Sequence, residues 1–145
     1  MKKLKKNQKG FTLVEIIVVL VILAILAAAA VPTMLGYVDD AKKKTELANA
    51  RTSFVAAQSI VTEKFAMATG TNTVRDTAAK GAITDAEVAR LTGLTATEFD
   101  VVTGATDLVV TDGKVIKFTY RGATHTTVIE PPKEPVITAN TVSPT

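Results

Sequence analysis

Residues 16–31 read IIVVLVILAILAAAAV, sixteen apolar residues in succession. The apolar character extends upstream to Phe11, across Thr12 and Glu15, and downstream to Val38. As a helix, residues 11–38 would be roughly 42 Å long, whereas the hydrocarbon core of a bilayer is about 30 Å thick. The sequence therefore predicts a helix over residues 11–38 that is long and apolar enough to cross a membrane.

The composition of the whole chain excludes several kinds of site. The chain has 145 residues, which suits one modest domain, and it contains no Cys and one His. A disulfide framework, a thiolate metal site and a cysteine nucleophile are therefore excluded, as is a site built from several histidines. The chain also has no phosphate-binding glycine motif and no nearby Ser–acid arrangement around its histidine. We predict no enzyme activity, no metal site and no cofactor.

The positive charge is concentrated at the start of the chain. Five of the 17 Lys+Arg residues lie in the first ten positions, which leaves 12 basic against 14 acidic residues in the remainder. The body of the protein therefore offers no basic stripe for nucleic acid. Lysines before an apolar helix favour a cytoplasmic location for that end. Lys42–Lys44 on the far side weaken this asymmetry.

Hydropathy alone leaves three readings of the apolar segment open. It fits a cleaved secretory signal, with the small residues Ala27–Ala30 before Pro32, and it also fits a plain single-pass anchor or a prepilin leader. Glu15 favours the third reading. A carboxylate in mid-membrane costs about 2–3 kcal/mol, and less near an interface, so an ionisable residue there indicates function. A position of Glu15 in the headgroup zone is the alternative.

Residues 9–15, KGFTLVE, resemble the processing motif of type IV pilins, and the apolar stretch and Pro32 follow as in that family. The resemblance covers about residues 6–40. It implies that a prepilin peptidase cleaves after Gly10 and N-methylates the new amino terminus at Phe11. It also implies that Glu15 pairs with the Phe11 amine of a neighbouring subunit during assembly. Residues 1–10 would be the leader, 11–38 the transmembrane and assembly helix, and 39–145 the globular pilin domain.

The same resemblance predicts the function, the partners and the location. The chain would be a structural subunit, a single-pass cytoplasmic membrane protein surrounded by lipid before assembly and part of an extracellular pilus afterwards. Its partners would be other copies of itself, the peptidase, and a pilus assembly platform with its ATPase. Pseudopilins of type II secretion or competence systems have the same leader and are the first alternative. A single-pass enzyme or receptor ectodomain is the second. The absence of Cys favours a Gram-positive source.

A second helix pattern follows the apolar one, over residues 39–69. Its apolar residues recur at intervals of three and four, which is one stripe of a helix, and they are Leu47, Ala50, Phe54, Ala57, Val61, Phe65 and Ala68. Glu46 falls on another, polar face. Pro32 and Gly36 predict a kink, although a simple bend fits equally well. Gly70 fits the end of the helix.

The remaining residues predict a connector over 70–106, an antiparallel meander over 107–130 and a Pro-rich tail over 131–145. Residues 70–83 lack periodicity and read as a loop, and Thr84 to Glu87 form a capping box for a short helix that ends at Gly93. Asp112-Gly113 is a hairpin turn. The expected fold class is α+β, a long N-terminal helix packed on a sheet of three to four strands.

The alternation along the strands predicts which residues face the helix. Ile116, Phe118 and Tyr120 share one face of the second strand, and Val128 of the third strand points inward with His125 on the opposite face. A further edge strand at 136–141 is compatible with the prolines that flank it, as is a tail without order.

Overall fold

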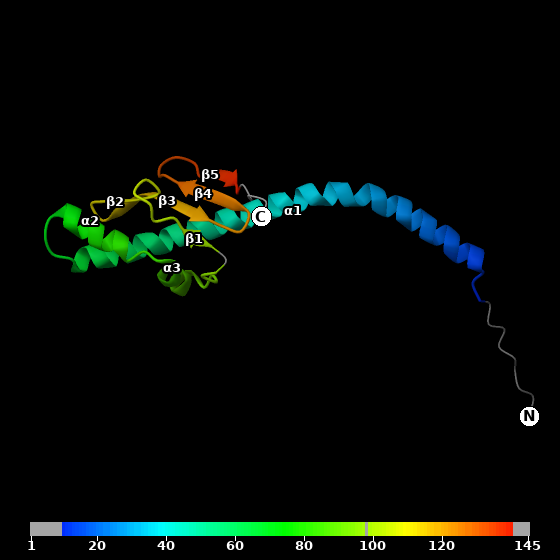
Figure 1. Cartoon of the computed structure of the whole chain (residues 1–145), viewed down its shortest axis with the longest axis horizontal. Coiled ribbons are helices and arrows are strands. Elements are labelled where there is room, and N and C mark those ends of the chain that lie inside the picture. The colour runs from blue at the N-terminus through cyan, green and yellow to red at the C-terminus, as the bar shows by residue number, and fades with distance from the viewer. Residues whose placement is uncertain (1–9, 98, 141–145) are drawn as a thin grey trace, which may run out of the picture. The chain divides into compact units, whose positions relative to one another are not determined.

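The computed structural model describes residues 10–97 and 99–140. The described residues form three helices, α1 (Leu13–Met67), α2 (Asn72–Gly81) and α3 (Asp85–Thr92), and five strands, β1 (Asp100–Val101), β2 (Leu108–Thr111), β3 (Lys114–Arg121), β4 (His125–Ile129) and β5 (Val136–Ala139). Figure 1 shows β3, β4 and β5 on one side of the C-terminal part of α1 and α3 on the other. The chain divides into two compact units, Met1–Asp39 and Asp40–Thr145.

All strand pairs in the sheet are antiparallel. The order is β1-β3-β4-β5, and β2 pairs with β3. β1 and β2 lie along the same edge of β3. β1 pairs with the end of β3, at Tyr120 and Arg121, and β2 pairs with the beginning of β3. The predicted α+β class, a long helix packed on a small antiparallel sheet, is confirmed. The sheet has five strands because two residues of the connector, Asp100 and Val101, also pair with β3.

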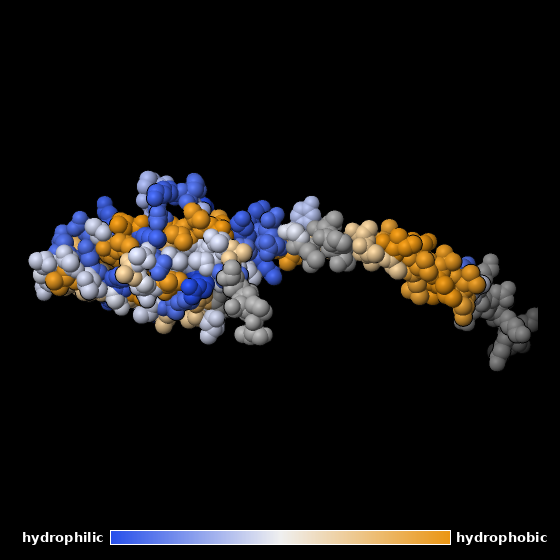
Figure 2. All heavy atoms as spheres, turned by 45° about the horizontal axis from the view of Figure 1, so that its top comes forward, coloured by the Kyte–Doolittle hydropathy of each residue, from blue (hydrophilic) through white to orange (hydrophobic). Residues whose placement is uncertain are grey.

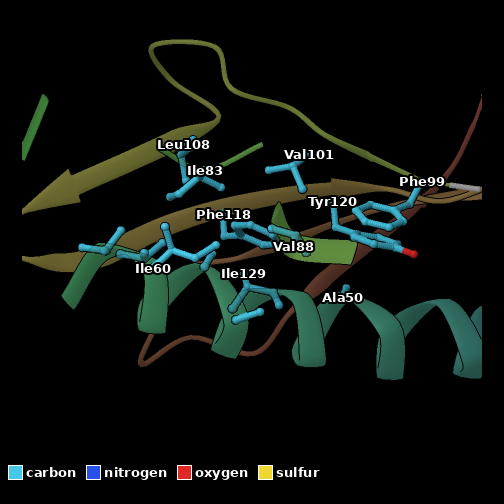
Figure 3. Close-up of a cluster of buried hydrophobic side chains, with 14 of the residues drawn as sticks. Ala50, Ile60, Ile83, Val88, Phe99, Val101, Leu108, Phe118, Tyr120 and Ile129 are labelled. Atoms are coloured by element: carbon cyan, nitrogen blue, oxygen red, sulfur yellow. The ribbon is translucent and has the colours of Figure 1, made fainter. Parts of the chain in front are cut away.

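The core lies between the sheet and the second half of α1. Ala50, Ala57 and Val61 of the predicted stripe are fully buried, and Ile60 joins them. Phe118 from β3 is fully buried and meets the Phe54 ring edge-on, with the ring centroids 6.0 Å apart. Figure 3 shows the stacked rings of Phe99 and Tyr120 at one end of this cluster, where their centroids are 5.3 Å apart.

The predicted facing of β3 was wrong in one position. Ile116 is 46% exposed, whereas Val115 and Phe118 are both buried. The partner of Val109 is Lys117, but the partner of Val110 is Val115, so the pairing skips Ile116. This bulge places one extra residue in β3, so the residues before it and those after it follow different alternations of buried and exposed side chains. Strict period-two counting therefore fails between Val115 and Phe118.

The predicted facing of β4 was also wrong. His125, Thr127 and Ile129 are buried, while Val128 is only half-buried. Val128 lies opposite Thr119 on β3 and Val136 on β5. Ile129, which pairs with Phe118, is the apolar residue of β4 that faces the core. The polar His125 is buried on the same face of β4, where it lies next to the Glu46 carboxylate.

The turns and caps largely follow the predictions. Thr84 accepts a hydrogen bond from the Glu87 amide and begins α3, and Gly93 ends it in the left-handed conformation at φ 73°. Asp112 and Gly113 have φ values of 50° and 71°, as a two-residue hairpin turn requires. Residues 72–81, however, form α2 where a loop was predicted. The predicted edge strand exists as β5, and residues 141–145 of the tail lie outside the described residues.

Candidate functional site

The expected processing site lies just before the first turn of α1. Gly10, Phe11 and Thr12 are outside the helix, which begins at Leu13, and all three are exposed. Phe11 is 84% exposed, and no atom lies within 4 Å of the position that a Cβ on Gly10 would take. The Gly10–Phe11 peptide bond therefore lies in an exposed segment before the helix. Residues 1–9 of the predicted leader lie outside them.

Thr12 and Glu15 bind each other across the start of α1. The Thr12 amide donates to Oε2 of Glu15 at 2.8 Å, and the Thr12 hydroxyl donates to the same oxygen at 2.9 Å. In return, the Glu15 amide donates to Oγ1 of Thr12 at 3.3 Å. This is a reciprocal capping box, which satisfies amides that the first turn of a helix leaves without partners. The sequence contains the pattern, although our prediction for Glu15 concerned only assembly.

The apolar part of α1 is uncovered. Leu13–Ala30 is long and apolar enough to cross a membrane, and none of this window is buried within the structure. Figure 2 shows its side chains as a continuous apolar surface along the part of α1 that is blue in Figure 1. A soluble monomer rarely leaves such a large apolar surface in water. The segment is therefore suited to lipid or to other copies of the chain.

The predicted kink residues, Pro32 and Gly36, lie within α1, which is helical from Leu13 to Met67. Gly36 is exposed, and no atom lies within 4 Å of the position of its absent Cβ. The kink at Pro32 and Gly36 stays a prediction.

A second polar cluster joins α1 to the turn between β3 and β4. Oε1 of Glu46 accepts hydrogen bonds from the amide and the hydroxyl of Thr124, at 2.9 and 2.8 Å. Oε2 accepts one from the His125 amide at 2.6 Å and lies 3.4 Å from Nδ1 of His125. Glu46 and His125 are both buried. The amphipathic pattern placed Glu46 on a polar face and missed this cluster, because its partners lie far along the chain.

His125 also belongs to this cluster through its ring. Its Nδ1 lies 2.8 Å from the Thr124 hydroxyl, which in turn donates to Glu46. His125 is thus a buried structural residue and not the exposed strand residue that we predicted. The cluster holds the sheet on the helix.

One shallow groove on the globular unit is lined by polar residues that already make structural contacts. This groove, of about 580 Å³, is lined by Lys80, Asp85 and Asp100, among others. Lys80 donates to the Gly104 carbonyl, Asp85 accepts from the Val101 amide, and Asp100 pairs with Arg121. Among the described residues, no group of three or more His, Asp or Glu side chains is placed to hold a metal ion.

Comparison with known proteins gives one match. The family model of the prokaryotic N-terminal methylation motif matches residues 5–31, a stretch that includes Gly10, Phe11 and Glu15. No curated protein and no solved structure matches the chain. The matched family is defined by a structural motif and is not an enzyme family. Together with the uncovered apolar helix, this match shows that the chain carries the type IV prepilin leader motif at residues 5–31.

Proposed function

We propose that this chain is a structural subunit of a type IV pilus, processed by a prepilin peptidase and polymerised through the N-terminal part of α1. The observation that carries the proposal is the methylation motif at residues 5–31, which includes the apolar helical segment Leu13–Ala30, none of which is buried among the described residues. The motif is shared with pseudopilins, so the pseudopilin of a secretion or DNA-uptake system is the other outcome. The Gram-positive source stays a prediction from the absence of Cys.

The conformation of the processing site supports cleavage between Gly10 and Phe11. A protease must place the scissile bond in an extended backbone between its catalytic groups, and both residues lie outside the helix and are exposed. Gly10 has no Cβ, which permits a close approach of the backbone to those groups. Cleavage there would leave Phe11 with a free amine two residues before the helix begins. N-methylation of Phe11 keeps this amine cationic.

Glu15 is the proposed acceptor for that amine on a neighbouring subunit. An ionised carboxylate or ammonium is costly in apolar surroundings, and pairing the two groups removes much of this cost. Glu15 lies among Leu13, Val14 and Ile16, so the pair would form in such surroundings. One stagger between neighbouring helices would bring the two charges together, and this stagger would be favoured over the others.

Polymerisation would transfer the apolar surface of Leu13–Ala30 from lipid to a bundle of helices. Lipid chains are as apolar as leucine, so escape from water does not drive this step, and packing and charge pairing must do so. A separate assembly platform and its ATPase would supply the mechanical work.

The proposal is tested by comparing filaments from cells that make the wild type, Glu15→Ala, or the control Glu63→Ala. Glu63 is an exposed residue of α1 within the globular unit, where it pairs with Lys64. We expect all three proteins to be inserted and cleaved after Gly10. Electron microscopy of sheared surface material should show filaments for the wild type and Glu63→Ala and few or none for Glu15→Ala. Normal filaments from Glu15→Ala would contradict the charge pairing, and only short fibres in the envelope would indicate a pseudopilin.

A further inference from the structure

Glu15 already has a partner within its own chain. Thr12 and Glu15 are the only polar residues between Phe11 and Val31, and they lie one turn apart at the start of the helix. Both donors of Thr12, its amide and its hydroxyl, point at the same oxygen of Glu15, at 2.8 and 2.9 Å. In the described part of the chain, the other oxygen, Oε1, accepts no hydrogen bond. The carboxylate is thus held on one side and open on the other.

This arrangement changes the energetics of the unassembled subunit. A carboxylate that enters an apolar environment without hydrogen bonds loses its hydration without compensation. Two donors on Oε2 replace part of that hydration, and hydrogen bonds to an ionised acceptor are stronger than those between neutral groups. Thr12 therefore stabilises the charge of Glu15 before any neighbouring subunit arrives.

The hydroxyl group also restricts the orientation of the carboxylate. Thr12 is β-branched, so its side chain has few conformations, and its hydroxyl both donates to Oε2 and accepts from the Glu15 amide. These contacts limit the rotation of the Glu15 side chain. A glutamate at this position without them would have to be ordered when the amine binds, at an entropic cost.

We propose that Thr12 is a positioning residue for assembly, which holds Glu15 through Oε2 and leaves Oε1 for the Phe11 amine of the incoming subunit. This inference rests on the proposed function. It assigns to Thr12 a role that acts through Glu15 and is separate from cleavage of the Gly10–Phe11 bond.

The test compares Thr12→Ser and Thr12→Gly in the full chain, expressed in cells with the pilus machinery. Serine keeps the hydroxyl. Glycine removes it, yet glycine begins helices nearly as well as threonine, so a role limited to starting the helix would leave Thr12→Gly normal. Each variant is scored for insertion, for its N-terminus by mass spectrometry, and for the amount of sheared filament relative to membrane-bound subunit.

We expect both variants to be inserted and cleaved like the wild type. Filament from Thr12→Ser should be near the wild-type amount, and filament from Thr12→Gly should fall roughly tenfold, the size expected from losing a hydrogen bond to a charged group. Wild-type filament from Thr12→Gly, or a Thr12→Ser defect as large as that of Thr12→Gly, would overturn the proposal. Failure of Thr12→Gly to be cleaved would also overturn it, because Thr12 would then act at the peptidase.

Glu15→Ala separates this inference from the proposed function. If Glu15→Ala gives normal filaments, the charge pairing itself fails, and the role of Thr12 fails with it. If Glu15→Ala gives none while Thr12→Gly gives normal filaments, the pairing stands and only the role of Thr12 is refuted.

Discussion

At the scale of single residues, Glu46 connects two parts of the fold that are far apart in sequence. Its carboxylate accepts from both backbone amides at the start of β4 and from the Thr124 hydroxyl. A buried acceptor with three donors stabilises the packing of the sheet on the helix. No disulfide can perform this task, because the chain has no cysteine.

Replacing Glu46 with glutamine should lower the free energy of unfolding by about 2 kcal/mol, since the amide group turns a donor toward groups that need an acceptor. Urea unfolding of the full chain in detergent measures this, followed by the near-ultraviolet signal of Tyr120, which is stacked on Phe99. Glu63→Gln serves as the matched control, because Glu63 is exposed. Equal stabilities of the two variants would contradict the structural role of Glu46.

Gly122 is required where the turn approaches Glu46. A Cβ at this position would lie 2.8 Å from both Cδ and Oε2 of Glu46. Gly122→Ala should therefore destabilise the protein by about 1–3 kcal/mol, the usual cost of overpacking. Gly81→Ala is the control, since no atom lies within 4 Å of its added Cβ. Urea unfolding, as for Glu46, measures the free energy of unfolding of both variants. A Gly122→Ala variant as stable as Gly81→Ala would refute the close packing of Gly122 against Glu46.

The polar cluster could not be predicted from the sequence for a physical reason. A pattern along one helix indicates which residues share a face, but Glu46 and His125 are buried only because each meets the other across 79 positions. Thr12 and Glu15 are three residues apart, so their capping box can be read directly from the sequence. Local contacts are therefore predictable where long-range polar contacts are not.

At the scale of secondary-structure elements, local signals again decided what could be predicted. The Asp112-Gly113 turn and the caps of α3 were predictable because each depends on a few adjacent residues. Helix α2 was missed because its sequence is rich in threonine and alanine and lacks an apolar stripe. Its Asp76 carboxylate instead accepts from the Asp112 and Gly113 amides, at 2.9 Å each, so a tertiary contact fixes its place.

The β3–β4 pair and the turn that follows it meet at Glu130. This carboxylate pairs with Lys133 at 3.0 Å and with Lys117 of β3 at 3.2 Å. The hydrogen bond from Lys133, followed by that from Lys117, lowers the pKa of Glu130 below the ordinary value of 4.5. A lowered pKa in the folded state means that the ionised carboxylate stabilises the fold above 4.5, and that this contribution is lost as the pH falls through the folded value.

Glu130→Gln should therefore reduce the loss of stability on acidification below pH 4.5 and leave a small deficit at neutral pH. Thermal unfolding midpoints, measured for the wild type and the variant across this range, test the prediction. Glu134→Gln, at an exposed position in the same turn, is the control and should follow the wild type. A Glu130→Gln variant whose pH profile parallels that of the wild type would contradict the assignment.

At the scale of the whole molecule, the exposed apolar surface and the buried core lie in two different stretches of the sequence. Residues 13–30 offer an uncovered apolar surface, while the core of the unit Asp40–Thr145 buries its own apolar residues. Residues 136–140 of the tail are held without a disulfide, because β5 pairs with β4, Asn140 donates to the Gly122 carbonyl, and the Thr126 hydroxyl donates to Asn140. The division into leader, membrane segment and globular domain stays a prediction, as does the role of each in assembly.

The central claim is that the chain is cleaved after Gly10 and keeps its apolar helix. Mass spectrometry of the N-terminal peptide of the mature protein, isolated from the membrane or from sheared filaments, tests it most directly. The account predicts a mature chain that begins with N-methylated Phe11 and retains Leu13–Ala30. A mature chain that begins near Val31, or one that retains Met1 with an uncleaved leader, would contradict it.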